Sequence, residues 1–133
     1  MVYLDTSVAL AHLRAEDVRP PDALWEESLV ASRLLEYETL SRLHAQGRST
    51  THGDAARDLL RHVAMLELVQ PVIGRAAEPY PVGVRTLDAL HLASMLFLVD
   101  QGIDLRLASY DRRLSQAADA LGIVSYPLTT GER

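Results

Sequence analysis

The sequence predicts an α/β fold: a three-layer α/β/α sandwich around a parallel sheet of four or five strands. Two observations support this prediction. Short apolar runs that are typical of buried strands alternate along the chain with longer segments of helical patterning. Strands joined by helices of ten or more residues form βαβ units, whose strands run parallel and whose helices cover the sheet. The chain has 133 residues, of which 48% are hydrophobic, so we expect one domain over residues 1–133.

The first half of the chain is expected to contribute two strands and four helices. Pro20 and Pro21 favour the start of a short helix, and Gly47 is a typical helix end. Thr6 or Ser7 is expected to cap the first helix. In chain order, the predicted elements are a strand at 2–4, a helix over 7–14, a short helix through Trp25, a strand at 28–32 and helices over 33–45 and 54–65.

The second half is expected to contribute three strands and two helices. A strand over 66–72 stops at Pro71, and the Pro- and Gly-containing segment 74–85 is a loop or a short helix. Thr86 is expected to cap a long helix that Gly102 ends, and its apolar residues on nearly all sides predict burial. The remaining predicted elements are a strand at 104–110, a helix over 112–121 and a fifth strand at 123–126.

Composition indicates the compartment. The chain contains no cysteine, which excludes disulfides and thiolate metal sites and fits a reducing environment. The longest apolar stretch, 89–99, is interrupted by His91 and is shorter than the about 20 residues that cross a bilayer. A strand that begins at Val2 leaves no room for a signal peptide. We therefore expect a soluble, cytoplasmic protein without a membrane partner.

The charge limits how the chain can bind nucleic acid. The formal net charge is −5, which argues against coating nucleic acid through bulk positive charge. All 13 basic residues are arginines, whose planar guanidinium suits phosphate. Local recognition by arginine pairs such as Arg42 and Arg48 is compatible with this composition. The structural alternative is that these arginines only cover exposed helix faces.

Three aspartates follow or flank the predicted strands. Asp5 ends the first strand, Asp111 follows the strand at 104–110, and Asp88 lies in the first turn of the long helix. Ligands of open parallel sheets bind beyond the carboxyl ends of the strands, so the three could converge at one edge. Each also has a purely structural explanation, since a helix N-cap contributes about 1 kcal/mol and a first-turn acid about 0.3–1 kcal/mol.

Asp88 is the least compatible with a capping role alone. It shares its direction on the helix with Leu92 and Met95, so its carboxylate is partly desolvated and needs a partner. No cationic side chain lies one turn further along, whereas a divalent cation would serve. A fourth acid is expected from the helix over 33–45, but helical periodicity does not choose between Glu36 and Glu38.

A cluster of acids has a specific chemistry. Like charges repel unless a cation lies among them, and oxygen ligands without cysteine or paired histidine suit Mg²⁺ or Mn²⁺. One or two such ions can activate a water and stabilise the leaving oxygen of a phosphodiester. The chain lacks the glycine-rich phosphate loops, the nucleophile elbow and the H-E-x-x-H zinc motif. Clustered acids are the catalytic arrangement that remains.

Four segments occur in the order and spacing of a known family: "YLDTSVAL", "SRLLEYETLSRL", "VRTLDALHLASML" and "LASYDRRLSQAADALGI". Together they resemble the PIN-domain family, and within it the VapC toxins of bacterial toxin–antitoxin pairs. The resemblance implies a Mg²⁺- or Mn²⁺-dependent endoribonuclease that cuts a structured RNA, such as a tRNA or rRNA, by water attack. It also implies a homodimer, and inhibition by a VapB antitoxin whose C-terminal segment lies over the acidic pocket.

The resemblance assigns roles to individual residues. Asp5 and Asp88 match the family's principal metal ligands, while Glu38 and Asp111 would complete the site directly or through water. Glu38 rather than Glu36 is chosen because it falls six residues after Ser32 in the motif. The hydroxyl positions of the family, which would orient carboxylate, water or phosphate, correspond to Thr6 and Ser109. Two departures are a serine in "SYD", where threonine is commoner, and a short stretch between the first helix and the second strand.

Two other functions are compatible with the acids. A catalytically idle PIN fold would only bind a partner, but all four acids are present. A receiver-like domain would take a phosphoryl group on Asp5, yet it usually needs a second acid beside the first and a lysine, and this chain has no lysine. His91 is expected to be hydrogen-bonded in the core rather than to bind metal.

Overall fold

The computed structural model describes residues 1–14 and 18–128 and has a parallel four-stranded sheet at its centre. The strands are β1 (Val2–Leu4), β2 (Leu29–Ser32), β3 (Val63–Leu66) and β4 (Arg106–Ala108). They lie in the order β3-β2-β1-β4, and every described pairing is parallel. All residues of β1 and β2 are buried. The predicted fold class is confirmed.

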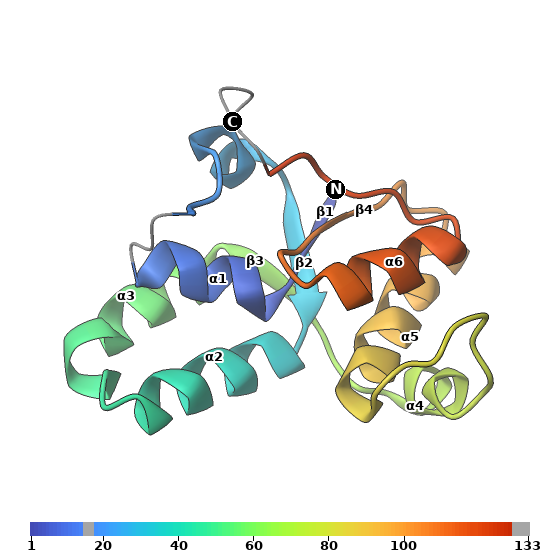
Figure 1. Ribbon diagram of the computed structural model, residues 1–133, viewed down its shortest axis with the longest axis horizontal. Helices are drawn as coiled ribbons and strands as arrows, with labels where there is room; N and C mark the ends of the chain where they lie inside the picture. Colours follow the sequence, from blue (N-terminus) through green and yellow to red (C-terminus); the bar gives the residue numbers. More distant parts are fainter. Residues whose placement is uncertain (15–17, 129–133) are drawn as a thin grey trace.

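Helices cover both faces of this sheet. Figure 1 shows α1, α2 and α3 on one side of the strands and α4, α5 and α6 on the other. A short 3₁₀ helix, Asp22–Glu26, precedes β2. The bounds of the α-helices are α1 Thr6–Leu13, α2 Leu34–Ala45, α3 Ser49–Arg61, α4 Gln70–Ala76, α5 Thr86–Asp100 and α6 Arg112–Ala120.

The alternation of side chains along β1 divides the core into two layers. Val2 and Leu4 face the layer that α1, α2 and α3 cover, where they pack with residues such as Leu35. Tyr3 points the other way and packs with Leu92 and other residues of α5 and α6. Because both faces of the strand are covered, its apolar run is continuous, as is typical of a parallel sheet.

The third strand lies earlier than predicted. β3 occupies residues 63–66 rather than 66–72, and the preceding helix α3 covers 49–61 rather than 54–65. Residues 70–76 form α4 instead, with Pro71 in its first turn. Proline lacks the N–H that has no partner at a helix start, so here it begins a helix rather than ending a strand. Gly74, expected in a loop or short helix, lies inside α4, while most of 77–85 is irregular.

Helix caps and the last strand also differ from the predictions. The N-cap of α1 is Asp5 rather than Thr6 or Ser7, and that of α5 is Arg85, so Thr86 is already helical. The fifth predicted strand, 123–126, is reduced to a single parallel bridge between Leu107 and Ser125. Within residues 1–14 and 18–128, no helix combines the length and apolar character that crossing a membrane requires.

Candidate functional site

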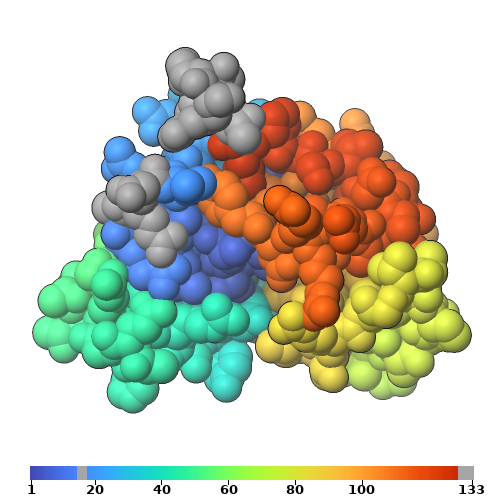
Figure 2. Space-filling view, viewed as in Figure 1, coloured from blue at the N-terminus to red at the C-terminus, as the bar shows by residue number. Residues whose placement is uncertain are grey.

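The four acids predicted from the sequence line one pocket of about 380 Å³. The pocket lies beyond the carboxyl ends of β1 and β4, between α2 and the first turn of α5. In Figure 2 the surface is notched between α2 and the start of α5. Besides the acids Asp5, Glu38, Asp88 and Asp111, its walls contain Thr6, Ser7, His91 and two arginines, Arg42 and Arg85.

A larger cavity of about 670 Å³ adjoins this pocket under the 77–85 loop. It shares Arg85 and Thr86 with the acid pocket but contains none of the four predicted acids. Its lining contains one carboxylate, that of Glu78, which pairs with Arg75, so it offers no cluster of acids for the expected chemistry. The chemistry of the side chains, not the size of the cavity, therefore identifies the candidate site.

Asp5 is buried and held through one of its two oxygens. Its Oδ2 accepts hydrogen bonds from the backbone N–H of Ser7 at 3.3 Å, the Ser7 hydroxyl at 2.6 Å and the Ser109 hydroxyl at 2.8 Å. Among the described residues, Oδ1 takes part in no hydrogen bond. The Asp5 carboxylate thus caps α1, which was the structural alternative for this residue, and it also keeps a second oxygen available.

Two serines connect the ends of β1 and β4 around Asp5. The Ser109 hydroxyl accepts from the backbone N–H of Asp111 at 2.9 Å while it donates to Asp5, and the Ser7 hydroxyl accepts from the N–H of Tyr110 at 2.9 Å. Ser109 therefore contacts two of the four acids, the carboxylate of Asp5 and the backbone N–H of Asp111. The sequence predicts only a capping role for Ser7, although its place two residues after Asp5 is a signal for this contact.

Asp111 is exposed and caps α6. Its Oδ1 accepts from the backbone N–H groups of Arg113 at 3.0 Å and Leu114 at 3.2 Å. This arrangement leaves Oδ2 without a partner among the described residues. Like Asp5, Asp111 combines a capping role with a position on the pocket wall.

Glu38 is buried in the pocket, whereas Glu36 lies outside it and pairs with Arg33. Glu38 Oε1 accepts from the Thr6 hydroxyl at 2.8 Å and lies 2.9 Å from His91 Nε2. The structure thus places Glu38, the glutamate that the family motif indicates, beside the other acids, and leaves Glu36 outside the pocket. His91 is buried and hydrogen-bonded as expected, but its partner is one of the four acids, a contact that the sequence pattern does not predict.

The pKa of Glu38 and that of His91 shift in opposite directions. Burial alone would raise the pKa of Glu38, but the hydrogen bond and charge of His91, with smaller contributions from Thr6 and Arg42, lower it. Burial alone would lower the pKa of His91, but Glu38, Asp5 and Asp88 together raise it. The pair therefore stabilises the fold fully between the ordinary values of about 4.3 and 6.5. That stability is lost as pH falls through the pKa of Glu38 or rises through the pKa of His91.

Asp88 is half-buried in the first turn of α5, and its pKa is raised. Burial is the main cause and the negative charge of Asp111 the next. The backbone N–H of Arg85 and the positive charges of Arg85 and His91 offset part of the shift. Asp88 and Asp111 therefore repel each other across the pocket.

The donor chemistry of the pocket fits a hard divalent cation, because the acids offer carboxylate oxygens and the neighbouring groups are hydroxyls. In the described part of the chain, however, no group of three or more histidine, aspartate or glutamate side chains is placed to hold one metal ion. The structure brings the four acids into one pocket without assembling them into a closed ligand set.

Fold and site together define a class of protein: a three-layer α/β domain with carboxylates gathered beyond the ends of its parallel strands. A family model for the PIN domain matches residues 2–120. The chain belongs to the PIN domain family.

Proteins of known name agree with this assignment. The chain is 37% identical to Ribonuclease VapC46 of Mycobacterium tuberculosis, over 92% of this chain and 93% of that protein. It is 30% identical to Ribonuclease VapC47 of the same species, over 94% of this chain and 95% of that protein. The resemblance to VapC toxins that the sequence motifs predicted is confirmed.

Two solved structures share the fold at low sequence identity. Mycobacterium tuberculosis VapC20, described as a sarcin-ricin loop cleaving toxin, superimposes with a TM-score of 0.67 and 18% identity, covering 95% of this chain and 98% of that one. A toxin–antitoxin complex from Klebsiella pneumoniae gives a TM-score of 0.63 and 15% identity, covering 94% and 97%. At such identities the likeness concerns the fold alone.

Repulsion within the pocket leads to a first prediction. Asp88→Asn is expected to raise the free energy of unfolding by about 0.5 kcal/mol at about pH 7 without divalent cations, since the side chain is only half-buried. A raised pKa means that the folded chain holds the charged form less well than the unfolded chain does. The cost is thus absent below the ordinary pKa of about 3.9, grows as pH rises from there and is complete above the raised pKa of the folded chain. Urea unfolding with a chelator, at about pH 7 and about pH 3.5, measures both conditions.

The matched control is Asp54→Asn, which removes an exposed acid of α3 that does not line the pocket. Equal stabilisation by this control would contradict repulsion in the pocket as the cause. A loss of stability on Asp88→Asn at about pH 7 would contradict it as well.

Proposed function

We propose that this chain is a metal-dependent endoribonuclease and the toxin of a type II toxin–antitoxin system. The observation that carries the proposal is the shared pocket of Asp5, Glu38, Asp88 and Asp111, four acids that come from α2, α5 and the ends of β1 and β4. The sequence similarity to the VapC ribonucleases supports the proposal, because it extends over more than nine-tenths of this chain and of each relative. The substrate is a structured RNA, such as a tRNA or rRNA.

The proposed cofactor is Mg²⁺, with Mn²⁺ as a substitute. Asp5 and Asp88 would be the principal ligands, and Glu38 and Asp111 would complete the site directly or through water. Hydrogen bonds from protein donors engage only Oδ2 of Asp5 and only Oε1 of Glu38 among the described residues, so each acid keeps an oxygen for this purpose. When bound, the ion supplies activation of a water and neutralisation of charge at the phosphate.

The residues of the chain itself orient the reaction. Ser7 and Ser109 fix the Asp5 carboxylate, and Thr6 fixes that of Glu38, so neither carboxylate must be ordered when the substrate arrives. The oxygen of the attacking water forms a bond to phosphorus while the bond to the leaving ribose oxygen breaks. One proton of the water passes to a carboxylate or to solvent, and the leaving ribose oxygen takes up a proton from solvent.

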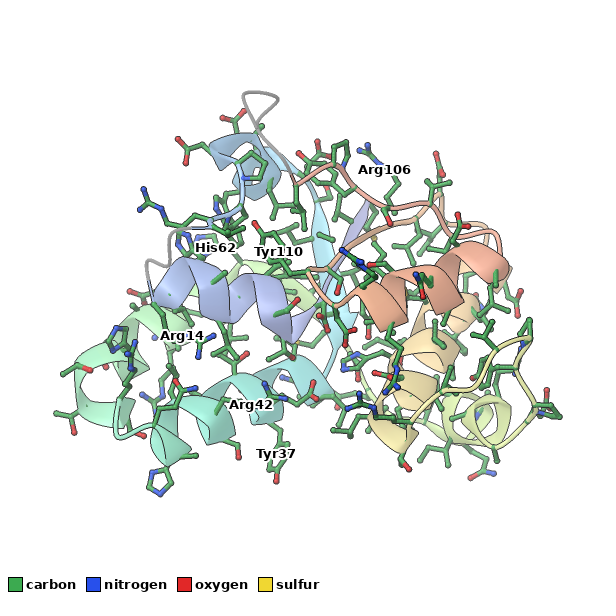
Figure 3. The ribbon with its side chains drawn as sticks, viewed as in Figure 1. Arg14, Tyr37, Arg42, His62, Arg106 and Tyr110 are labelled. Carbon is green, nitrogen blue, oxygen red and sulfur yellow. The ribbon has the colours of Figure 1, made fainter. Side chains whose placement is uncertain are left out.

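Arg42 and Arg85 are the proposed contacts to RNA phosphates beside the bond that is cut. Both are exposed, both line the pocket, and among the described residues neither forms an ion pair. Arg42 lies on α2 (Figure 3), and in the sequence of this helix it comes four residues, about one turn, after Glu38. Because the net charge of the chain is −5, such local cations must supply the attraction that the whole surface does not.

The proposal includes partners and a site of action. A VapB-type antitoxin would neutralise the toxin by laying its C-terminal segment over the acid pocket, and a neighbour in fold was solved as a toxin–antitoxin complex. A homodimer and action in the cytoplasm complete the proposal. The comparisons lend no support to an idle binding module or to a receiver-like phosphoacceptor, and the chain has no lysine for the latter.

Substitution of the acids tests the activity. Asp5→Asn and Asp88→Asn are expected to lower Mn²⁺-dependent cleavage by more than the about 10–100-fold that loss of an outer hydrogen-bond partner costs. Glu38→Gln has a matched control in Glu36→Gln, which lies on the same helix but outside the pocket. Cleavage of total RNA by antitoxin-free protein is the measurement, with sequencing of the cut ends to identify the substrate. Wild-type protein without divalent-dependent cleavage, or full activity in Asp5→Asn, would contradict the proposal.

Metal binding has a readout that does not depend on catalysis. A cation that binds only the folded chain should stabilise it by about 2.7 kcal/mol at a hundredfold excess over Kd. We therefore expect a higher melting temperature of the wild type in Mn²⁺, an unchanged response in Glu36→Gln and a much smaller one in Asp88→Asn. The same rise in Asp88→Asn as in the wild type would rule out a site shared by these acids.

The role of the arginines is visible in the salt dependence of RNA binding. Arg42→Ala and Arg85→Ala should each reduce the slope of log K against log salt by about 0.7, the contribution of one phosphate contact on single-stranded nucleic acid. Filter binding with a cleavage-deficient Asp5→Asn background measures this slope. Arg57→Ala, an exposed arginine of α3 outside the pocket, is the control. If Arg57→Ala changes the slope as much as the other two, the contacts are not specific to the pocket.

A further inference from the structure

A buried chain of hydrogen bonds connects the central sheet to Glu38. The backbone N–H of Ser32 donates to the Tyr3 hydroxyl at 3.2 Å, and that hydroxyl lies 2.7 Å from His91 Nδ1. On the other side of the ring, His91 Nε2 lies 2.9 Å from Glu38 Oε1. The four groups come from β2, β1, α5 and α2, so the chain spans both layers of the core.

Every member of this chain is shielded from solvent. Tyr3 and Ser32 are 0% exposed, His91 2% and Glu38 8%. The Tyr3 and His91 rings meet edge to face at 84°, with centroids 5.9 Å apart, which fixes the plane of the imidazole. Buried polar groups arranged in this way rarely change partner, because each alternative leaves a donor or acceptor unpaired.

We propose that His91 is a positioning residue, which sets the orientation of the Glu38 carboxylate through its Nε2–H group. The inference deepens the proposed function and rests on it, since Glu38 matters here as a residue of the nuclease site. In this role His91 does not touch the substrate and acts through Glu38.

The direction of the hydrogen bond follows from the chemistry of the two groups. An ionised carboxylate has no proton to donate, so the ring nitrogen that faces it must carry one. The Tyr3 hydroxyl can donate to Nδ1 or accept from it, and both possibilities leave a proton on Nε2. The ring is therefore anchored on one side and directed at Oε1 on the other.

As a consequence, one oxygen of the Glu38 carboxylate, Oε1, is held by hydrogen bonds. Thr6 and His91 both donate to Oε1, so rotation of the Glu38 carboxylate would break two buried hydrogen bonds at once. Oε2 is thereby the oxygen left for the pocket. Without His91, Thr6 would be the one hydrogen-bond donor left to Glu38 among the described residues, and the carboxylate would lose a defined orientation.

His91→Leu and His91→Gln separate positioning from core packing. Leucine keeps an apolar side chain in the core but has no donor, and we expect an about 10–100-fold loss in kcat and in Mn²⁺ affinity with KM for RNA little changed. Glutamine restores an N–H donor and should recover most of the loss. Tyr3→Phe, which removes the anchor but keeps the ring, should lie between the two. Thr39→Val is the control, because this buried hydroxyl of α2 has no hydrogen-bond partner among the described residues and does not line the pocket.

Nitrogen NMR of the wild-type protein labelled at histidine tests the same inference without any variant. A proton on His91 Nε2, with a signal that changes in Glu38→Gln, supports the proposal. A bare Nε2 with the proton on Nδ1 would overturn it, as would a folded His91→Leu with wild-type kcat and Mn²⁺ affinity. A wild type without Mn²⁺-dependent cleavage would count against the nuclease function, and the NMR signal would still decide whether His91 orients Glu38.

Discussion

The parallel pairing of β1 with β4 is the constraint on which the site depends. Leu4 lies opposite Ala108, and the backbone N–H of Asp5 donates to the Ala108 carbonyl at 3.0 Å. Residues that follow these strands must therefore lie side by side, although about a hundred positions separate them in the chain. The contact of Ser109 with Asp5 and that of Tyr110 with Ser7 both follow from this register.

The site combines stability and reactivity in the same side chains. Asp5 and Asp111 each use one carboxylate oxygen to cap a helix, an arrangement that stabilises the fold, and Glu38 uses one oxygen in a buried hydrogen-bond chain. Asp88 is the exception, since its pKa is raised by burial and by Asp111. Three acids are thus held by the fold, and the fourth is tolerated at a cost that a cation would remove.

Local sequence patterns predicted the elements that depend on contacts between residues close in the chain. They were wrong or silent where contacts between distant segments determine the structure. The sequence pattern correctly predicted β1, the acid that follows it and the long helix α5. β3 was misplaced because Pro71 is equally compatible with the end of a strand and the start of a helix. Glu36 and Glu38 are indistinguishable on an isolated helix, since only the position of α2 against α1 and α5 separates them. The contact between His91 and Glu38 joins residues 53 positions apart, beyond the reach of any periodicity.

An acidic protein with an acidic pocket must solve a problem of charge before it can cut RNA. Arg42 and Arg85 balance half the charge of the four carboxylates, and one divalent ion would balance the rest. The metal-free pocket therefore repels a phosphate, whereas the loaded pocket is close to neutral and flanked by guanidinium groups. Thermodynamic linkage then requires that metal and RNA each strengthen the binding of the other. On this view the proposed cation does more than chemistry at phosphorus, because it also makes the pocket acceptable to the substrate.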